Sequence, residues 1–202
     1  NKSAVARVNS GHFPFVERGG DEQLAMALKR GLEATTDIKE CALADVIVFV
    51  IGTPVDEHLN PKLSEVLRIF DTYRPFFKPS SLVIMRSTLF PGTMDHLHLR
   101  LRNQKISIKL AFCPERVAQG AALDEIDSLP QIVSAFDEES FNAAYEVFSK
   151  LAPSIIRLTP IEAEMTKLMA NSWRYLEFAI ANQFYLIAEN NGVDFYKIFQ
   201  AI

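Results

Sequence analysis

The chain has 202 residues, a formal net charge of −4 at pH 7, and 49% apolar and 23% charged residues. This composition is typical of a soluble globular protein, and the acidic balance argues against nucleic acid or an anionic membrane as a partner. No apolar run is long enough to span a membrane. Cys41 and Cys113 show neither metal-ligand spacing nor a disulfide framework, so we expect a cytoplasmic protein without a metal.

The first part of the chain predicts short helices and one strong strand. Residues 46–51 are six consecutive apolar residues without alternation, which predicts a strand buried on both faces, as in a parallel sheet covered by helices. Before it we expect helices at 3–9 and 21–30, the second capped by Asp21 and ended by Gly31. A short strand at 32–35 and a helix at 37–43 complete this part.

Strand and helix patterns then alternate up to residue 158. We expect helices at 64–77, 93–103 and 137–151, and strands within 80–88 and at 106–113, 131–136 and 154–158. Strands separated by helical patterns predict an α/β fold with a mostly parallel sheet.

One long helix follows, over residues 159–191. Thr159 and Glu162 form a capping-box pattern around Pro160, and Asn191-Gly192 supplies a stop. At about 1.5 Å per residue the helix is roughly 45 Å long, more than one small domain needs. We therefore expect something to pack along Pro160–Asn190.

Three strand ends carry polar or open-backbone residues where ligands of parallel sheets bind. Gly92-Thr93 opens a helix, whose free N–H groups favour an anion such as phosphate. For each end taken alone, an ordinary strand-to-helix turn is the alternative. The three ends are Gly52-Thr53-Pro54, Arg86-Ser87-Thr88 and Cys113-Pro114-Glu115-Arg116.

Glu164, Lys167 and Asn171 share one face of the long helix. Such a row is often a solvated stripe. The alternative is a cation and an amide directed together at an oxyanion that develops on a reacting carbonyl.

The chain resembles the UDP-glucose/GDP-mannose dehydrogenases, which oxidise a nucleotide sugar at C6 from alcohol to carboxylate with two NAD. Four stretches match family signatures in the family's order: ADVIVFVIGTPVDE, RSTLFPGT, FCPERVAQGAALDEI and EAEMTKLMANSWR. The form Pro114-Glu115-Arg116-Val117, followed by Gly120-Ala121, is closest to the branch that oxidises UDP-N-acetylmannosamine or UDP-N-acetylglucosamine. The resemblance implies a doubly wound, Rossmann-like NAD domain at 1–158, and a central dimerisation helix with the start of another helix at 159–202.

The resemblance also implies a cofactor path. Thr53, Pro54, Ser87 and Thr88 would lie along the NAD, with Thr88 near the nicotinamide, where it helps to hold a water.

At the substrate, the resemblance implies an acid/base and an oxyanion site. Glu115 would act as acid/base at C6, and Arg116 would contact the sugar nucleotide. Lys167 and Asn171 would bind the substrate and stabilise the oxyanion, and Thr88 would join them as a catalytic residue.

Two family features have no counterpart in the sequence. The Gly-rich turn G-x-G-x-x-G is absent, and neither Cys41 nor Cys113 matches the nucleophilic cysteine that family members carry beyond the long helix. We therefore expect a chain truncated at both ends of the family pattern, with a sheet that lacks its first strands and has an open edge at 46–51. We also expect weak NAD binding and no complete oxidation by this polypeptide alone.

Two other functions remain open. The chain could be a non-catalytic remnant that retains the dimerising helix as an assembly module, or a related dehydrogenase of hydroxy acids, which would share the sheet and long helix. The favoured function is a fragment of a nucleotide-sugar 6-dehydrogenase that serves polysaccharide biosynthesis.

Overall fold

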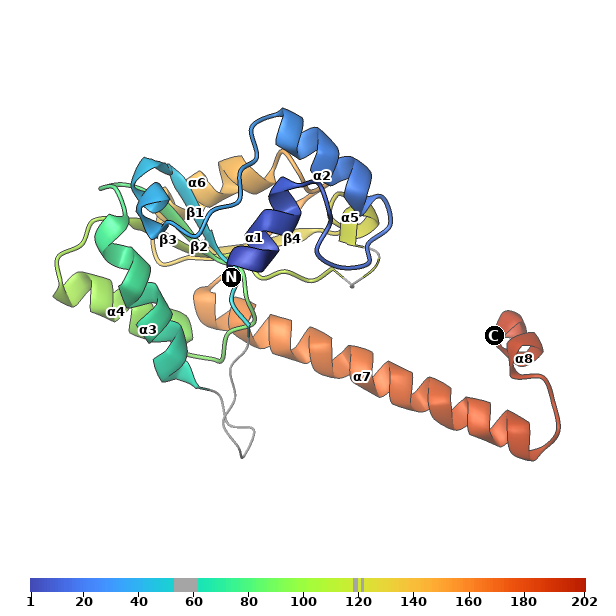
Figure 1. The fold of residues 1–202 in the computed structure, drawn as a ribbon. Helices are drawn as coiled ribbons and strands as arrows, with labels where there is room; N and C mark the ends of the chain where they lie inside the picture. The colour runs from blue at the N-terminus through green and yellow to red at the C-terminus, as the bar shows by residue number, and fades with distance from the viewer. Residues whose placement is uncertain (53–61, 118–119, 121) are drawn as a thin grey trace.

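A five-stranded, mostly parallel sheet organises the first three quarters of the chain (Figure 1). The computed structural model describes residues 1–52, 62–117, 120 and 122–202. The strands are β1 (Val46–Phe49), β2 (Leu82–Met85), β3 (Lys109–Phe112), β4 (Gln131–Ala135) and β5 (Ile155–Leu158), in that spatial order. Only the β3–β4 pair is antiparallel. The predicted fold class is confirmed.

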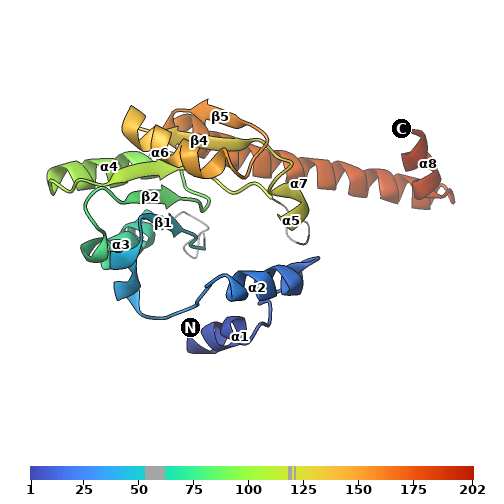
Figure 2. The same cartoon turned by 90° about the horizontal axis from the view of Figure 1, so that it is seen from above.

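Helices cover the two faces of the sheet. The helices α3 (Leu63–Tyr73) and α4 (Thr93–Asn103) and the first turns of α7 (Pro160–Asn190) pack on one face, and α6 (Glu138–Phe148) packs on the other (Figure 2). In β2, Val83 and Met85 belong to the first core and Leu82 and Ile84 to the second, so this strand is buried on both faces.

Strand β1 corrects one prediction. Ile47 and Phe49 are buried, but Val46, Val48 and Val50 are exposed, with 40%, 45% and 77% of their surface accessible. The reason is position: β1 is the edge strand of the described sheet, α3 covers only one of its faces, and α6 contacts β2, β3 and β4 instead. The edge expected at 46–51 is present.

The start of the chain differs in detail from the prediction. Helix α1 is Lys2–Asn9, and α2 is Gly20–Lys29 with left-handed Gly19 as its N-cap. The predicted cap was wrong, because the Asp21 carboxylate instead accepts the N–H of Phe13 at 3.1 Å. The strand predicted at 32–35 is absent from the structure, which has irregular backbone there. Residues Ile38–Leu43 form a 3-10 helix, η1, and Arg74–Phe76 form another, η2, at the end of α3.

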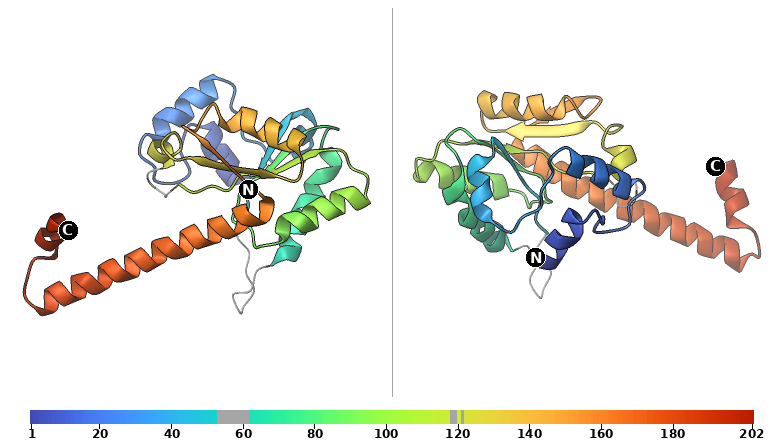
Figure 3. Two further views of the ribbon diagram at one scale, coloured as in Figure 1. Left: turned by 180° about the vertical axis from the view of Figure 1, so that it is seen from behind. Right: turned by 45° about the horizontal axis from the view of Figure 1, so that its top comes forward.

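A short helix that the sequence did not predict, α5 (Ala122–Glu125), connects distant parts of the chain. The Glu17 carboxylate accepts the N–H groups of Gly120 and Ala122 at 2.9 and 2.8 Å. The segment between α1 and α2 is thereby held at the start of α5 (Figure 3).

The long helix α7 leaves the sheet and extends away from it (Figures 1 and 3). Its predicted capping box is confirmed: the Thr159 N–H donates to Glu162 at 2.7 Å, and the Glu162 N–H donates to the Thr159 hydroxyl. Past its first turns α7 is largely exposed, apolar side chains included, and α8 (Phe195–Ala201) lies near its far end. No helix in the described part of the chain has both the length and the apolar character of a membrane span.

Candidate active site at the strand ends

Arg86 connects the end of β2 to the end of β3 and the start of β4. It follows β2, and one of its terminal nitrogens donates to the Cys113 carbonyl at 3.2 Å and to Gln131 Oε1 at 3.1 Å. The guanidinium lies 4.9 Å from the centre of the Phe148 ring on α6, within the range of a cation–π contact. Because these contacts come from β3, β4 and α6, the guanidinium has one fixed position.

The Glu115 carboxylate is held on both oxygens. Its Oε2 atom forms an ion pair with Arg86, whose side chain is only 11% exposed. Its Oε1 atom accepts the backbone N–H groups of Arg116 and Val117 at 2.8 and 3.1 Å. These bonds orient the carboxylate at the rim of the sheet.

Lys167 brings a second cation to this carboxylate from α7. Its side chain is half-buried, and burial lowers its pKa, opposed by the negative charge of Glu115. Arg174, Arg116 and Arg86 lower the pKa further. In the part of the chain that the structure describes, Lys167 Nζ has no ion-pair partner. Among the described residues, the ammonium is therefore within range of the Glu115 charge without being ion-paired to it.

Glu164, one turn earlier on α7, is fully buried and is not part of a solvated stripe. Its two oxygens accept the N–H groups of Gly92 and Met94 at 2.7 and 2.8 Å. The free N–H groups expected at the start of α4 are thus occupied by a side chain, and the phosphate site suggested at Gly92-Thr93 is wrong. Burial raises the Glu164 pKa, and the N–H bonds partly oppose this.

Other residues on the same face of α7 complete this side of the site. Asn171 is partly buried one turn after Lys167, and Arg174 donates to the Arg116 carbonyl at 3.3 Å. The Arg116 side chain itself donates to the Pro130 carbonyl. A small pocket is lined by Arg86, Pro114, Glu115, Arg116, Val117, Glu125, Ile126, Leu129, Pro130 and Gln131.

The predicted cofactor residues lie nearer to β1. The Ser87 hydroxyl accepts the Ile51 N–H at 2.5 Å, which joins the ends of β1 and β2. Thr88 lines a separate small pocket beside the start of α3, with Lys62 and Phe90. Thr53 and Pro54 lie outside the described residues.

Cys113 is completely buried at the end of β3. Burial raises the pKa of its thiol to about 12, and the charge of Arg86 only partly offsets this. A thiol that stays protonated is a poor nucleophile. Among the described residues, no group of three or more His, Cys, Asp and Glu side chains could hold a metal.

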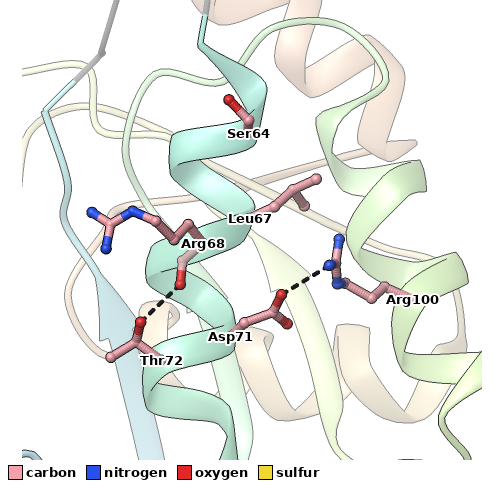
Figure 4. Close-up of a pocket in the computed structure, with 6 residues that line it drawn as sticks. All are labelled: Ser64, Leu67, Arg68, Asp71, Thr72 and Arg100. Atoms are coloured by element: carbon pink, nitrogen blue, oxygen red, sulfur yellow. Dashed lines mark hydrogen bonds and ion pairs between the residues drawn. The ribbon is translucent and has the colours of Figure 1, made fainter.

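A separate open pocket between α3 and α4 holds none of the predicted site residues (Figure 4). Asp71 forms an ion pair there with Arg100 at 2.9 Å.

The sequence did not predict the roles of three side chains in this site. Arg86 directly follows the apolar strand β2, and Gln131 is the first residue of the apolar strand β4. For Arg86, the available signal was a charge directly after a strand that is buried on both faces. Glu164 had only its helical spacing, which does not distinguish burial from exposure.

Comparison with known proteins decides the family. Residues 1–152 match the model of the NAD binding domain of the UDP-glucose/GDP-mannose dehydrogenase family, and residues 161–202 match its central domain. The chain belongs to the UDP-glucose/GDP-mannose dehydrogenase family.

Relatives within this dehydrogenase family are similar in sequence and in structure. The chain is 34% identical over 158 residues to UDP-N-acetyl-D-mannosamine dehydrogenase of Methanocaldococcus jannaschii, covering 76% of this chain and 37% of that protein. The structure of UDP-D-ManNAc dehydrogenase from Pyrococcus horikoshii covers all of this chain at a TM-score of 0.86 and 27% identity. The structure of a ternary complex of GDP-mannose dehydrogenase from Pseudomonas aeruginosa also covers all of this chain, at a TM-score of 0.88 and 25% sequence identity. The chain spans about half of each of these structures.

A dinucleotide in this family's fold would lie across the carboxyl ends of the parallel strands. A Cβ added to Gly52 would meet no atom of the described residues within 4 Å, so these residues leave space beside Gly52, after the end of β1. Ser87 is buried and its hydroxyl accepts the Ile51 N–H, while Thr88 lines the separate pocket beside α3, so neither hydroxyl is shown to face this space. The amides of α4 contribute nothing, because Glu164 occupies them.

Proposed function

We propose that the protein containing this chain is an NAD-dependent nucleotide-sugar 6-dehydrogenase. It oxidises the C6 alcohol of a UDP-sugar, of the UDP-N-acetylhexosamine type, to a carboxylate for polysaccharide biosynthesis. The observation that carries the proposal is the Glu115 carboxylate, oriented by Arg86 and two backbone N–H groups at the rim of a domain that matches the family's NAD-binding model. An oriented carboxylate and an unpaired ammonium are the groups that alcohol oxidation needs.

Each side chain has a role in the proposed reaction. Glu115 accepts the proton of the C6 hydroxyl, since Oε2 retains a free lone-pair site beside its ion pair with Arg86. Lys167 and Asn171 stabilise the negative charge that develops on the C6 oxygen. Arg116 contacts the sugar nucleotide. Bound NAD accepts the hydride, and Thr53, Pro54, Ser87 and Thr88 line its path, with Thr88 holding a water near the nicotinamide.

The depressed pKa of Lys167 supports this assignment. Burial removes water from the ammonium and lowers its pKa. A partly desolvated cation interacts more strongly with a new negative charge than a hydrated one does. The stabilisation that Lys167 provides is therefore largest when the oxyanion forms.

We propose that the domains divide at 158/159 and that α7 makes a homodimer of this cytoplasmic enzyme. Support comes from its apolar side chains, which the described chain leaves exposed, among them Met169, Trp173, Leu176, Ile180 and Phe184. Light scattering on the purified protein tests the dimer. A monomeric mass that Leu176→Asp leaves unchanged argues against it.

The test of the function is a substrate panel with the complete natural protein. NAD reduction is followed with UDP-N-acetylmannosamine, UDP-N-acetylglucosamine, UDP-glucose, GDP-mannose and a set of 2-hydroxy acids. We expect turnover with a UDP-N-acetylhexosamine. Reduction with hydroxy acids alone would falsify the proposal, and no reduction with any of them favours the assembly module.

A further inference from the structure

Two cations interact with the Glu115 carboxylate. Arg86 approaches from the end of β2 and forms the ion pair, whereas Lys167 approaches from α7 and interacts only through charge. A mobile carboxylate beside a half-buried ammonium gains by closing on it, because the attraction is stronger where water is scarce. Something in the structure must therefore keep the two apart.

The contacts of Arg86 supply that restraint. Arg86 is fixed by the Cys113 carbonyl, Gln131 and the Phe148 ring, so it is a rigid partner and not a flexible surface side chain. An arginine held by several planar contacts loses little freedom when it binds a carboxylate. The N–H groups of Arg116 and Val117 hold the other carboxylate oxygen on the same side.

We propose that Arg86 is a positioning residue whose ion pair with Glu115 keeps that carboxylate from closing on Lys167. The ammonium thus stays free for an anionic oxygen of the substrate, and the carboxylate keeps the orientation it needs as a base. Without Arg86 the two groups pair with each other, and both are withdrawn from the substrate. The benefit to turnover rests on the function proposed above.

Four charges act on Lys167, which makes its titration a sensor of this arrangement. Glu115 raises its pKa, while Arg174 from α7, Arg116 from the loop after β3 and Arg86 from β2 lower it. Loss of the Arg86 charge alone raises the Lys167 pKa by a fixed amount. Closure of Glu115 on Lys167 adds a second rise that requires the carboxylate.

The experiment is a double-mutant cycle on the complete protein without substrate. Competitive labelling with acetic anhydride, followed by mass spectrometry, gives the titration midpoint of the Lys167 amine in wild type, Arg86→Met, Glu115→Gln and the double variant. We expect Arg86→Met to move the midpoint to higher pH by clearly more when residue 115 is Glu than when it is Gln. Equal shifts in the two backgrounds overturn the proposal, because they show that Glu115 has not moved.

Two further variants serve as controls. Arg86→Lys keeps the charge and should leave the midpoint near that of wild type. Arg157 also pairs with a glutamate, Glu138, and lies 4.1 Å from the centre of a phenylalanine ring, but its charge does not act on Lys167. Arg157→Met should therefore leave the midpoint unchanged. A shift as large as that of Arg86→Met would also contradict the proposal.

The outcome is independent of the substrate and of folding problems. If Arg86→Met does not fold, Arg86→Gln replaces it, because an amide can still donate to the Cys113 carbonyl. A crystal structure of the folded variant should show the Glu115 carboxylate within ion-pair distance of Lys167 Nζ. If the substrate panel fails while this cycle shows the larger shift with Glu, the proposed function falls and the role of Arg86 stands.

Discussion

The carboxylate of Glu164 on α7 accepts the backbone N–H of Met94, in the first turn of α4, at 2.8 Å. Its other oxygen accepts the N–H of Gly92 at 2.7 Å. A buried anion here satisfies N–H groups that have no partner within α4 and lies at the positive end of the helix dipole. This contact fixes the start of α7 on the sheet domain, and Lys167 follows one turn later.

Replacing Glu164 tests this contact through its pH dependence. Gln at 164 presents an NH2 group to one of the two N–H donors, so we expect Glu164→Gln to lower the free energy of unfolding by about 1–3 kcal/mol. The folded-state pKa of Glu164 is raised above its ordinary value of 4.5 by burial. The stability that Glu164 contributes is therefore greatest below about pH 4.5 and falls as the pH rises through the folded pKa. Urea unfolding should show the difference between wild type and variant shrinking with rising pH.

Glu162 provides a matched control, because its contribution to stability should change with pH in the opposite direction. It is exposed, and its bonds to Thr159 lower its pKa. Its contribution is therefore present above the unfolded pKa and lost as the pH falls through the folded value. The stability difference for Glu162→Gln should grow with rising pH. A Glu164→Gln difference that also grows would contradict the burial of that carboxylate.

Lys167 should matter more for rate than for binding. Lys167→Met in the complete protein should lower kcat by about 100- to 1,000-fold with a smaller change in KM, since the contact strengthens as the oxyanion forms. Because burial lowers the pKa of Lys167, wild-type kcat should also fall on the alkaline side at a lower pH than an ordinary lysine would give. Lys150→Met, at an exposed helix end, is the control. If kcat/KM instead fell only because KM rose, with kcat unchanged, Lys167 would contribute to ground-state binding of the substrate and not to the rate.

Cys113 should be inert in the folded protein. With a thiol pKa of about 12, almost none of it is thiolate at pH 8. Iodoacetamide at pH 8 should label the partly buried Cys41 first and Cys113 only after unfolding, as peptide mass spectrometry can show. Rapid labelling of Cys113 in the folded state would show that the end of β3 opens.

Local sequence patterns predicted most of the fold because they depend on neighbours in the chain. The capping box at Thr159 and Glu162 is an example, and it is present in the structure. Whether a side chain is buried depends instead on which distant part of the chain packs against it. The apolar run of β1 is indistinguishable from that of β2, yet Val48 is exposed because no helix of the described residues covers its face at the edge of the sheet.

The candidate site shows the same limit. Lys167 lies on α7, within range of the Glu115 charge, which acts on its pKa, and the catalytic roles of the two residues stay predictions. Glu164 was ambiguous, since a glutamate on a helix face is exposed or buried depending on a partner 70 residues away in the chain. The α4 amides that looked free in the sequence are the donors that bind it.

The most direct test of the proposed function is the stoichiometry of the reaction of the complete protein. With limiting UDP-N-acetylhexosamine and excess NAD, we expect two NADH per sugar and a product that mass spectrometry identifies as the uronate. One NADH per substrate, with an aldehyde or ketone as the final product, would contradict the proposal that this chain belongs to a 6-dehydrogenase.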